Sequence, residues 1–506
     1  MAEITNLKEK AVKGVQWSFI NKFGTQIIAI LPSIVLARLI SPEDFGLVAM
    51  AGVFSGLAYI LSDGGFGTAL FQKKDADHLD FCSVFYFNIA LSTVVYILFF
   101  FIAPFCADFF GMPEITWIMR ISLLSLVLNS IGGLHGLIFR KNLDFRKPAI
   151  RNLLVQLISS IVAIVLALLD FGYWVLVIQG VLQTALGGIA NWLMCPWRPT
   201  LVFSSQRLHA MLGFGSRMFT TVLVDYGFDK SYDTVIGKFY SPSSLSFYNR
   251  ACSTANMFVD TIVGVINGVA YPALVQIQDD KERIRYNTLR FLRIATLCVF
   301  ILLSYLFVLS EPLFHFMYSS RWDTAIPFFK IVCIWGGLKC ITSILFNVIE
   351  AIGNSSAILK NSIIHKLCIV IVIITIWNRG IDFLLFGQLL ATFIQLLYFS
   401  YHTKKDIDVD LYAIFKNIFP QLLICILLSF FIYFIDGFVA DCLSVFEMRE
   451  AYEGIIRILI GILCCGTFTY ILCRLLKNHA LLDLFDIIRT TNNKQFIHKA
   501  INKLSY

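Results

Sequence analysis

The chain has 506 residues, of which 58% are hydrophobic and only 15% are charged, with a formal net charge of +8. Soluble domains average about 45–50% apolar and about 25% charged residues, so this composition excludes an ordinary soluble domain. The basic residues are concentrated in the loops on one predicted side of a membrane, so the positive charge reflects membrane orientation and does not indicate nucleic-acid binding.

Apolar segments long enough to cross a bilayer recur along the whole sequence. They predict an all-α polytopic membrane protein with about 14 transmembrane helices. The predicted spans are 15–38, 44–62, 81–104, 115–137, 148–169, 171–194, 208–237, 243–271, 287–310, 324–348, 357–377, 380–401, 418–437 and 453–475. The segments 208–237 and 243–271 are the most polar, and the alternative for them is a re-entrant or surface-lying segment.

Loops that are rich in lysine and arginine alternate along the chain with loops that are poor in them, and this alternation predicts how the protein is oriented in the membrane. The rich loops contain Lys8, Lys73, Arg140, Arg198, Lys281, Lys360, Lys404 and Arg474. One span added or lost in the middle would invert this bias downstream, so the pattern supports an even number of spans. We therefore predict a multi-pass protein of a bacterial cytoplasmic (inner) membrane, with both termini in the cytoplasm.

Two segments suggest an internal repeat. The sequence ARLISP at 37–42 follows the first predicted span, and GKFYSP at 237–242 follows the seventh, 200 residues later. Six spans per unit return the chain to the same side, so the repeats would be parallel and related by a pseudo-two-fold axis along the membrane normal. The predicted parts are a six-helix lobe at 1–206, a six-helix lobe at 207–405, two further helices at 406–476 and a cytoplasmic amphipathic basic tail at 477–506.

Charged residues inside predicted spans indicate a hydrated cavity, because a charge in hydrocarbon is costly unless it meets water or a partner. The seventh span is the most informative, since Asp225, Asp229 and Asp233 recur every four residues and so share one helix face. The cationic excess favours an anionic headgroup such as a phosphate. The substrate-binding candidates are Lys22, Arg120, Arg217, Asp225, Asp229, Lys230, Asp233, Arg250 and Lys339. The alternative is a set of inter-helix salt bridges with no ligand.

Motifs for covalent chemistry are missing from the sequence. It has no G-x-x-x-x-G-K-[ST] loop and no H-E-x-x-H or paired C-x-x-C spacing, so neither ATP hydrolysis nor a metal site is predicted. The D-x-D at 408–410 lies in a short loop with no soluble domain to present it. We therefore predict no catalytic residues, no metal and no cofactor.

Several blocks resemble a known family. The stretch VLARLISPEDFGLVAM at 35–50 is similar to the N-terminal signature of the polysaccharide transporters, which are Wzx-type flippases of the multidrug/oligosaccharidyl-lipid/polysaccharide exporter superfamily. LSDGGFGTAL at 61–70, FRKNLDFR at 139–146, DKSYDTVIGKFYSP at 229–242 and FYNRA at 247–251 continue the match. The resemblance covers roughly residues 10–400 and is greatest to the colanic-acid and teichuronic-acid exporters.

This resemblance implies a protein that moves polyprenyl-pyrophosphate-linked oligosaccharide repeat units, the precursors of O-antigen, capsule or exopolysaccharide, from the cytoplasmic to the outer leaflet by alternating access. The implied partners are this lipid-linked substrate, membrane lipid and the polysaccharide polymerase or chain-length machinery. Coupling to an ion gradient is proposed for some members. The alternatives are a drug/cation antiporter of the same superfamily, which would need a dominant acidic site, and a membrane-embedded polymerase or transferase, which would need a large outer loop.

Overall fold

The computed structural model describes residues 2–73, 75–444, 450–475, 480, 481 and 483, and every regular element among them is a helix. They form two compact units, 1–246 and 247–506. The membrane-type all-α fold is therefore confirmed. The assignment of six, six and two helices to two lobes and a C-terminal pair stays a prediction, because two compact units do not by themselves reveal a repeat. Of the amphipathic tail predicted at 477–506 the structure describes only residues 480, 481 and 483, so this tail stays a prediction.

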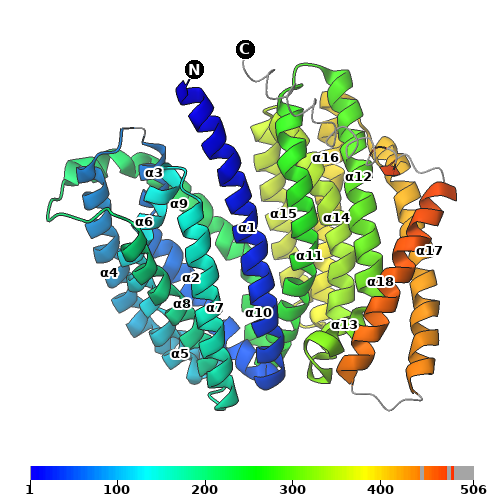
Figure 1. The fold of residues 1–506 in the computed structure, drawn as a ribbon, viewed down its shortest axis with the longest axis horizontal. Coiled ribbons are helices and arrows are strands. Elements are labelled where there is room, and N and C mark those ends of the chain that lie inside the picture. Colours follow the sequence, from blue (N-terminus) through cyan, green and yellow to red (C-terminus); the bar gives the residue numbers. More distant parts are fainter. Residues whose placement is uncertain (1, 74, 445–449, 476–479, 482, 484–506) are drawn as a thin grey trace. The chain divides into compact units, whose positions relative to one another are not determined.

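The helices of the first unit pack side by side (Figure 1). They are α1 (Ala2–Leu39), α2 (Pro42–Asp63), α3 (Phe66–Gln72), α4 (His78–Phe110), α5 (Glu114–Ser122), α6 (Leu124–Lys141), α7 (Arg146–Leu168), α8 (Trp174–Met194), α9 (Ser205–Asp229) and α10 (Ser231–Phe239). Helix α1 packs on α7, which packs on α8, and α8 in turn packs on α6. All four line the polar cavity described below.

The second unit contains most of α11 (Pro242–Val275) and the helices that follow it. They are α12 (Lys281–Val308), α13 (Ser310–Met317), the 3-10 helix η1 (Ser320–Trp322), α14 (Ala325–Ala351), α15 (Ser355–Ile376), α16 (Ile381–Ile407), α17 (Leu411–Ser444) and α18 (Glu450–Leu475). Helix α12 packs on both α14 and α17, and α14 packs on α16. A two-pronged ion pair joins the last two helices, because Arg457 donates to both carboxylate oxygens of Asp436 at 2.8 and 2.6 Å.

Thirteen helices among the described residues are long and apolar enough to cross a membrane. They include α11, which covers the polar segment predicted at 243–271. The other polar segment, 208–237, forms α9 and α10 instead of one helix, and neither is among the thirteen. The even total of 14 spans therefore stays a prediction.

Both copies of the Ser-Pro motif begin a helix in the same way. The hydroxyl oxygen of Ser41 accepts a hydrogen bond from the Asp44 backbone N–H at 3.1 Å, and that of Ser241 accepts one from the Ser244 N–H at 3.1 Å. A proline at the first helical position has no N–H to leave unsatisfied, so Ser-Pro is a strong helix start. The repeat noticed in the sequence thus corresponds to equal local structure at the start of α2 and α11.

A charged cluster ties α4 to the start of α9. The side chain of Asp80 is fully buried and accepts from Lys73 Nζ at 2.6 Å and from Arg207 Nη1 at 3.4 Å. Arg207 also pairs with Asp77, the residue that caps α4, at 3.2 Å. The Asp80 backbone N–H that donates to the Asp77 carboxylate, together with the Arg207 guanidinium, holds the pKa of Asp77 below its ordinary value.

Candidate functional site

A polar cavity lies inside the first unit, between α1, α2, α4, α6, α7 and α8. It consists of two adjoining chambers of about 480 and 360 Å³ that share Asn129, Arg151, Asn152 and Asn191 in their walls. Small-molecule sites have volumes of about 300–1,000 Å³, so each chamber is large enough for a ligand. The lining asparagines are Asn21, Asn88, Asn129, Asn152 and Asn191.

Arg151 is the centre of this cavity's hydrogen-bond network. Its Nη1 donates to Asn191 Oδ1 at 2.6 Å, and its Nε and Nη2 donate to Asn152 Oδ1 at 3.0 and 2.6 Å. Asn152 Nδ2 donates in turn to Asn21 Oδ1 at 3.1 Å. None of the ion pairs among the described residues involves Arg151, so its charge is held by amide oxygens alone. Charges within membrane-spanning helices typically face a partner or a hydrated cavity, and Arg151 lines both chambers of this one.

Glycines make room for the chambers. A Cβ atom on Gly132 of α6 would come within 2.5 Å of the Gly188 Cα of α8, so the two helix backbones touch at this point. Gly133 and Gly136 of α6 line the larger chamber, and Gly187 of α8 lines the smaller one. A Cβ on Gly187 would meet no atom within 4 Å. The backbones of α6 and α8 therefore pack closely at Gly132 and Gly188, while the glycines in the chamber walls have no side chains to fill the space.

Further amides complete the lining. Gln183 Nε2 donates to Gln156 Oε1 at 3.1 Å in the smaller chamber, and Asn129 Nδ2 donates to the Tyr59 hydroxyl at 3.1 Å in the larger one. The Oδ1 atom of Asn88 is buried and has no hydrogen-bond partner among the described residues. Since buried polar atoms are rarely left unpaired, this acceptor is available to water or to a ligand.

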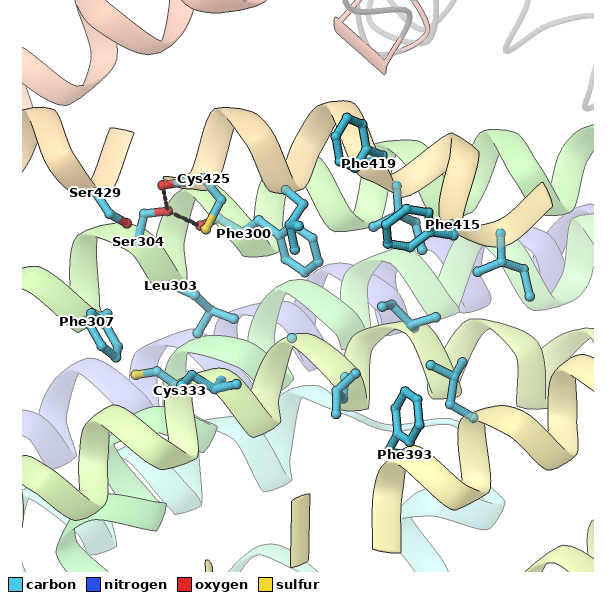
Figure 2. A pocket seen from close by; sticks show the side chains of 18 of the residues that line it. Phe300, Leu303, Ser304, Phe307, Cys333, Phe393, Phe415, Phe419, Cys425 and Ser429 are labelled. Atoms are coloured by element: carbon cyan, nitrogen blue, oxygen red, sulfur yellow. Dashed lines mark hydrogen bonds between the residues drawn. The ribbon is translucent and has the colours of Figure 1, made fainter. Parts of the chain in front are cut away.

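An apolar groove of about 910 Å³ lies in the second unit, between α12, α14, α16 and α17. Figure 2 shows Phe300, Phe393 and Phe415 among its lining side chains. The Ser304 hydroxyl, one of its few polar groups, donates within the protein to the Cys425 carbonyl oxygen at 3.1 Å and lies 2.8 Å from its Sγ. The groove therefore presents almost only carbon atoms.

Lys230 and Asp233 are two predicted site residues that form an ion pair, with Lys230 Nζ 2.6 Å from Asp233 Oδ2. Helix α9 ends at Asp229, and the Lys230 backbone leaves helical geometry with φ −91° and ψ 2° before α10 begins. The expectation that Asp225, Asp229 and Asp233 share one continuous helix face is therefore wrong beyond Asp229. Asp225 is half-buried and Asp229 is exposed.

The other candidates of the first unit have varied surroundings. Lys22 is exposed on α1. Arg120 packs between aromatic rings, with its guanidinium carbon 4.2 Å from the centre of the Phe100 ring and 5.1 Å from that of Trp117. The Arg217 side chain lies outside the described residues. The structure thus gives Arg120 a packing role, whereas substrate binding by these residues stays a prediction.

Two candidates lie in the second unit. The Arg250 guanidinium carbon is 4.8 Å from both the Tyr318 and Trp322 ring centres. Lys339 Nζ of α14 lies 2.7 Å from Asp260 Oδ1 of α11, and an amide pair, Asn347 to Asn267 at 2.8 Å, continues the polar contact between these helices. Arg250 and Lys339 therefore both have structural contacts, and their part in binding stays a prediction.

The polar cavity around Arg151 was missed because Arg151 stands near the start of the predicted span 148–169 and its partners in the cavity are uncharged amides, whereas the sequence analysis considered only charged residues. Its signal was present in the printed sequence as asparagines and glutamines that recur in the predicted spans 1, 3, 4, 5 and 6. Each amide in an apolar segment is individually unremarkable. Only the packing of α1, α4, α6, α7 and α8 shows that these amides face one space.

Known proteins match this chain in sequence and in fold. The succinoglycan biosynthesis transport protein ExoT of Rhizobium meliloti is 25% identical over 68% of this chain and 70% of its own length. The lipopolysaccharide biosynthesis protein WzxC of Escherichia coli is 24% identical over 66% of this chain and 69% of its own. The solved lipid II flippase MurJ, in an inward closed conformation, superposes with a TM-score of 0.69 over 91% of this chain and 99% of that one, at 19% identity, which demonstrates a shared fold.

The model of one family, described as polysaccharide biosynthesis protein, matches residues 35–327, more than half of the chain. That region contains all five sequence blocks that carried the resemblance, and it includes α2, α4, α6, α7 and α8 of the helices around the polar cavity. The chain therefore belongs to this polysaccharide biosynthesis protein family.

Proposed function

We propose that the chain is a flippase that exports polyprenyl-pyrophosphate-linked oligosaccharide repeat units from the cytoplasmic to the outer leaflet by alternating access. The observation that carries the proposal is that the chain offers both surfaces such a cargo needs. One is the apolar groove of about 910 Å³ and the other is the polar cavity around Arg151. Relatives named for polysaccharide biosynthesis and a lipid II flippase fold support the same cargo class.

The groove suits the lipid part of the cargo. An isoprenoid chain has no hydrogen-bonding groups, so it is held by apolar contact area at about 25 cal/mol per Å². Phe415 and Phe419 of α17 line the groove with 56% and 48% of their surface exposed, so an isoprenoid chain could reach them from outside the protein. Ordinary membrane lipids would compete for this surface, and selectivity must therefore come from the polar end of the cargo.

The charged residues of the membrane-spanning helices could bind the pyrophosphate headgroup and couple transport to an ion gradient. In this proposal Lys22, Arg250 and Lys339 attract the pyrophosphate, and intramembrane carboxylates such as Asp260 couple transport to an ion gradient. The chain then acts as a transporter without covalent chemistry or a bound cofactor. It works in the cytoplasmic membrane with both termini inside, and delivers its cargo to a polysaccharide polymerase on the outer face.

Deletion of the gene followed by lipid analysis tests the proposal. We expect surface polysaccharide to be lost while intact lipid-linked oligosaccharide accumulates on the cytoplasmic face, as measured by its accessibility to a membrane-impermeant glycosidase in inverted and right-side-out vesicles. If the units reach the outer leaflet normally but are not polymerised, the chain is a polymerase. If polysaccharide and lipid intermediates are both unchanged, a drug/cation antiporter becomes the better explanation.

Replacement of Lys22 by alanine is expected to lower export by about tenfold or more at unchanged membrane abundance, because one charge-assisted hydrogen bond is worth about 1.5–3 kcal/mol. Lys22 is exposed on α1, so the substitution removes little packing. Export is measured as surface polysaccharide per copy of the protein. Lys22→Arg keeps the charge and should retain most of the export, whereas equal activity of the alanine variant and the wild type would remove Lys22 from the headgroup site.

A further inference from the structure

We propose that the polar cavity of the first unit is a binding site for the saccharide part of the cargo. This inference rests on the proposed function and adds a subsite to it. The site is formed by α1, α2, α4, α6, α7 and α8 and is centred on Arg151. It contains none of the residues that the sequence analysis assigned to substrate binding.

The chemistry of the lining matches sugar hydroxyls. A hydroxyl both donates and accepts hydrogen bonds, and a side-chain amide does the same from two adjacent atoms. Asn21, Asn129 and Asn152 come from three different helices, α1, α6 and α7, and all face the larger chamber. Asn88 on α4 adds a buried oxygen that has no partner among the described residues. This arrangement provides acceptors and donors from several sides, as a ring of hydroxyls requires.

The same lining is poorly suited to a pyrophosphate. Phosphate groups are best held by several cations or by free guanidinium forks. Arg151 has five N–H donors, and three of them already point at amide oxygens. The other charged groups of the larger chamber are Arg140 and Asp63, which have opposite charge. What remains is two N–H groups on one guanidinium, which fits a pair of sugar oxygens, including those of a sugar carboxylate.

The two chambers have room for sugar rings because α6 and α8 present glycines to them. Gly133, Gly136 and Gly187 contribute only backbone to the walls. A side chain placed at Gly187 would enter the smaller chamber without striking another atom, since a Cβ there meets nothing within 4 Å. Gly180 on the same helix also has nothing within 4 Å of its Cβ, is exposed and lines neither chamber. These two glycines provide a matched pair for a test.

The test compares two lipid probes on the purified full-length protein in lipid nanodiscs, with equilibrium binding measured by native mass spectrometry. One probe is lipid-linked oligosaccharide extracted from native cells that lack the gene. The other is the sugar-free polyprenyl pyrophosphate. We expect the wild type to bind the glycosylated lipid more tightly. Gly187→Leu and Asn129→Leu should weaken that binding by about tenfold or more and leave the sugar-free lipid unaffected. Gly180→Leu should match the wild type with both probes.

Each other result has a definite meaning. If both cavity variants bind the glycosylated lipid as the wild type does, the saccharide subsite is refuted while the flippase proposal stands. If both probes are weakened equally and the variants melt like the wild type, the cavity holds the headgroup and the saccharide assignment is wrong. A wild type that binds neither probe would refute the proposed function and this subsite together.

Discussion

Replacing both Lys73 and Arg207 by alanine is expected to lower the free energy of unfolding by about 3–5 kcal/mol. These two cations are the ion-pair partners of Asp80, whose side chain is fully buried. Without them the Asp77 backbone N–H, at 3.1 Å, is the one hydrogen-bond donor that the described residues still offer to the carboxylate. A buried charge that loses its partners retains its whole desolvation cost, which explains the size of the effect.

Replacing the carboxylate instead of its cationic partners should lower the free energy of unfolding by less. Asp80→Asn frees cations whose side chains are 32% and 40% exposed, so both can turn toward water, and we expect a loss of about 1–2 kcal/mol. Chemical denaturation in detergent micelles measures both values. Asp75→Asn, an exposed change in the same loop, is the control and should have no effect. Equal losses for the two sides of the cluster would show that the carboxylate is not the buried, costly partner.

The apolar helices were predictable because span length and hydropathy are local properties. The span predicted at 324–348 is α14 (Ala325–Ala351), and that predicted at 357–377 is α15 (Ser355–Ile376). The segment 208–237 was not predictable to the same degree. Its helix ends at Asp229 because the Lys230 backbone departs from helical geometry, and i, i+4 spacing contains no information about such a joint. The Ser-Pro repeat, by contrast, was visible in the sequence as two similar segments after the first and seventh predicted spans, and the structure shows that each begins a helix.

The candidate site was harder to predict than the fold. Charges in spans are conspicuous, yet Arg120 packs on aromatic rings and Lys339 pairs with Asp260 on a neighbouring helix. Arg151 and Asn152 were visible in the sequence only as the start of a span. Their importance comes from Asn191 and Asn21, which are distant in sequence and adjacent in space. Amides become informative only when several helices bring them to one cavity, and single-sequence patterns do not contain that information.

The junction of the two Ser-Pro helices is predicted to tolerate no added atom at Gly46. A Cβ atom there would overlap the carbonyl group of Pro242, so the first turn of α2 lies directly against the first residue of α11. Overpacking typically costs about 1–3 kcal/mol, and here the obstacle is backbone that cannot rotate away. We therefore expect Gly46→Ala to lower the free energy of unfolding by about 3 kcal/mol and to reduce export strongly.

Gly52→Ala is the matched control for Gly46→Ala. Gly52 lies on the same helix, and a Cβ on it meets nothing within 4 Å, so this variant should unfold and export like the wild type. Denaturation in micelles gives the stability of both variants, and surface polysaccharide per copy of the protein gives their export. If Gly46→Ala is as stable as the control, α2 and α11 can separate at little cost. A stable but export-deficient Gly46→Ala would instead mean that close approach of the two repeated helix starts is needed for transport and not for folding.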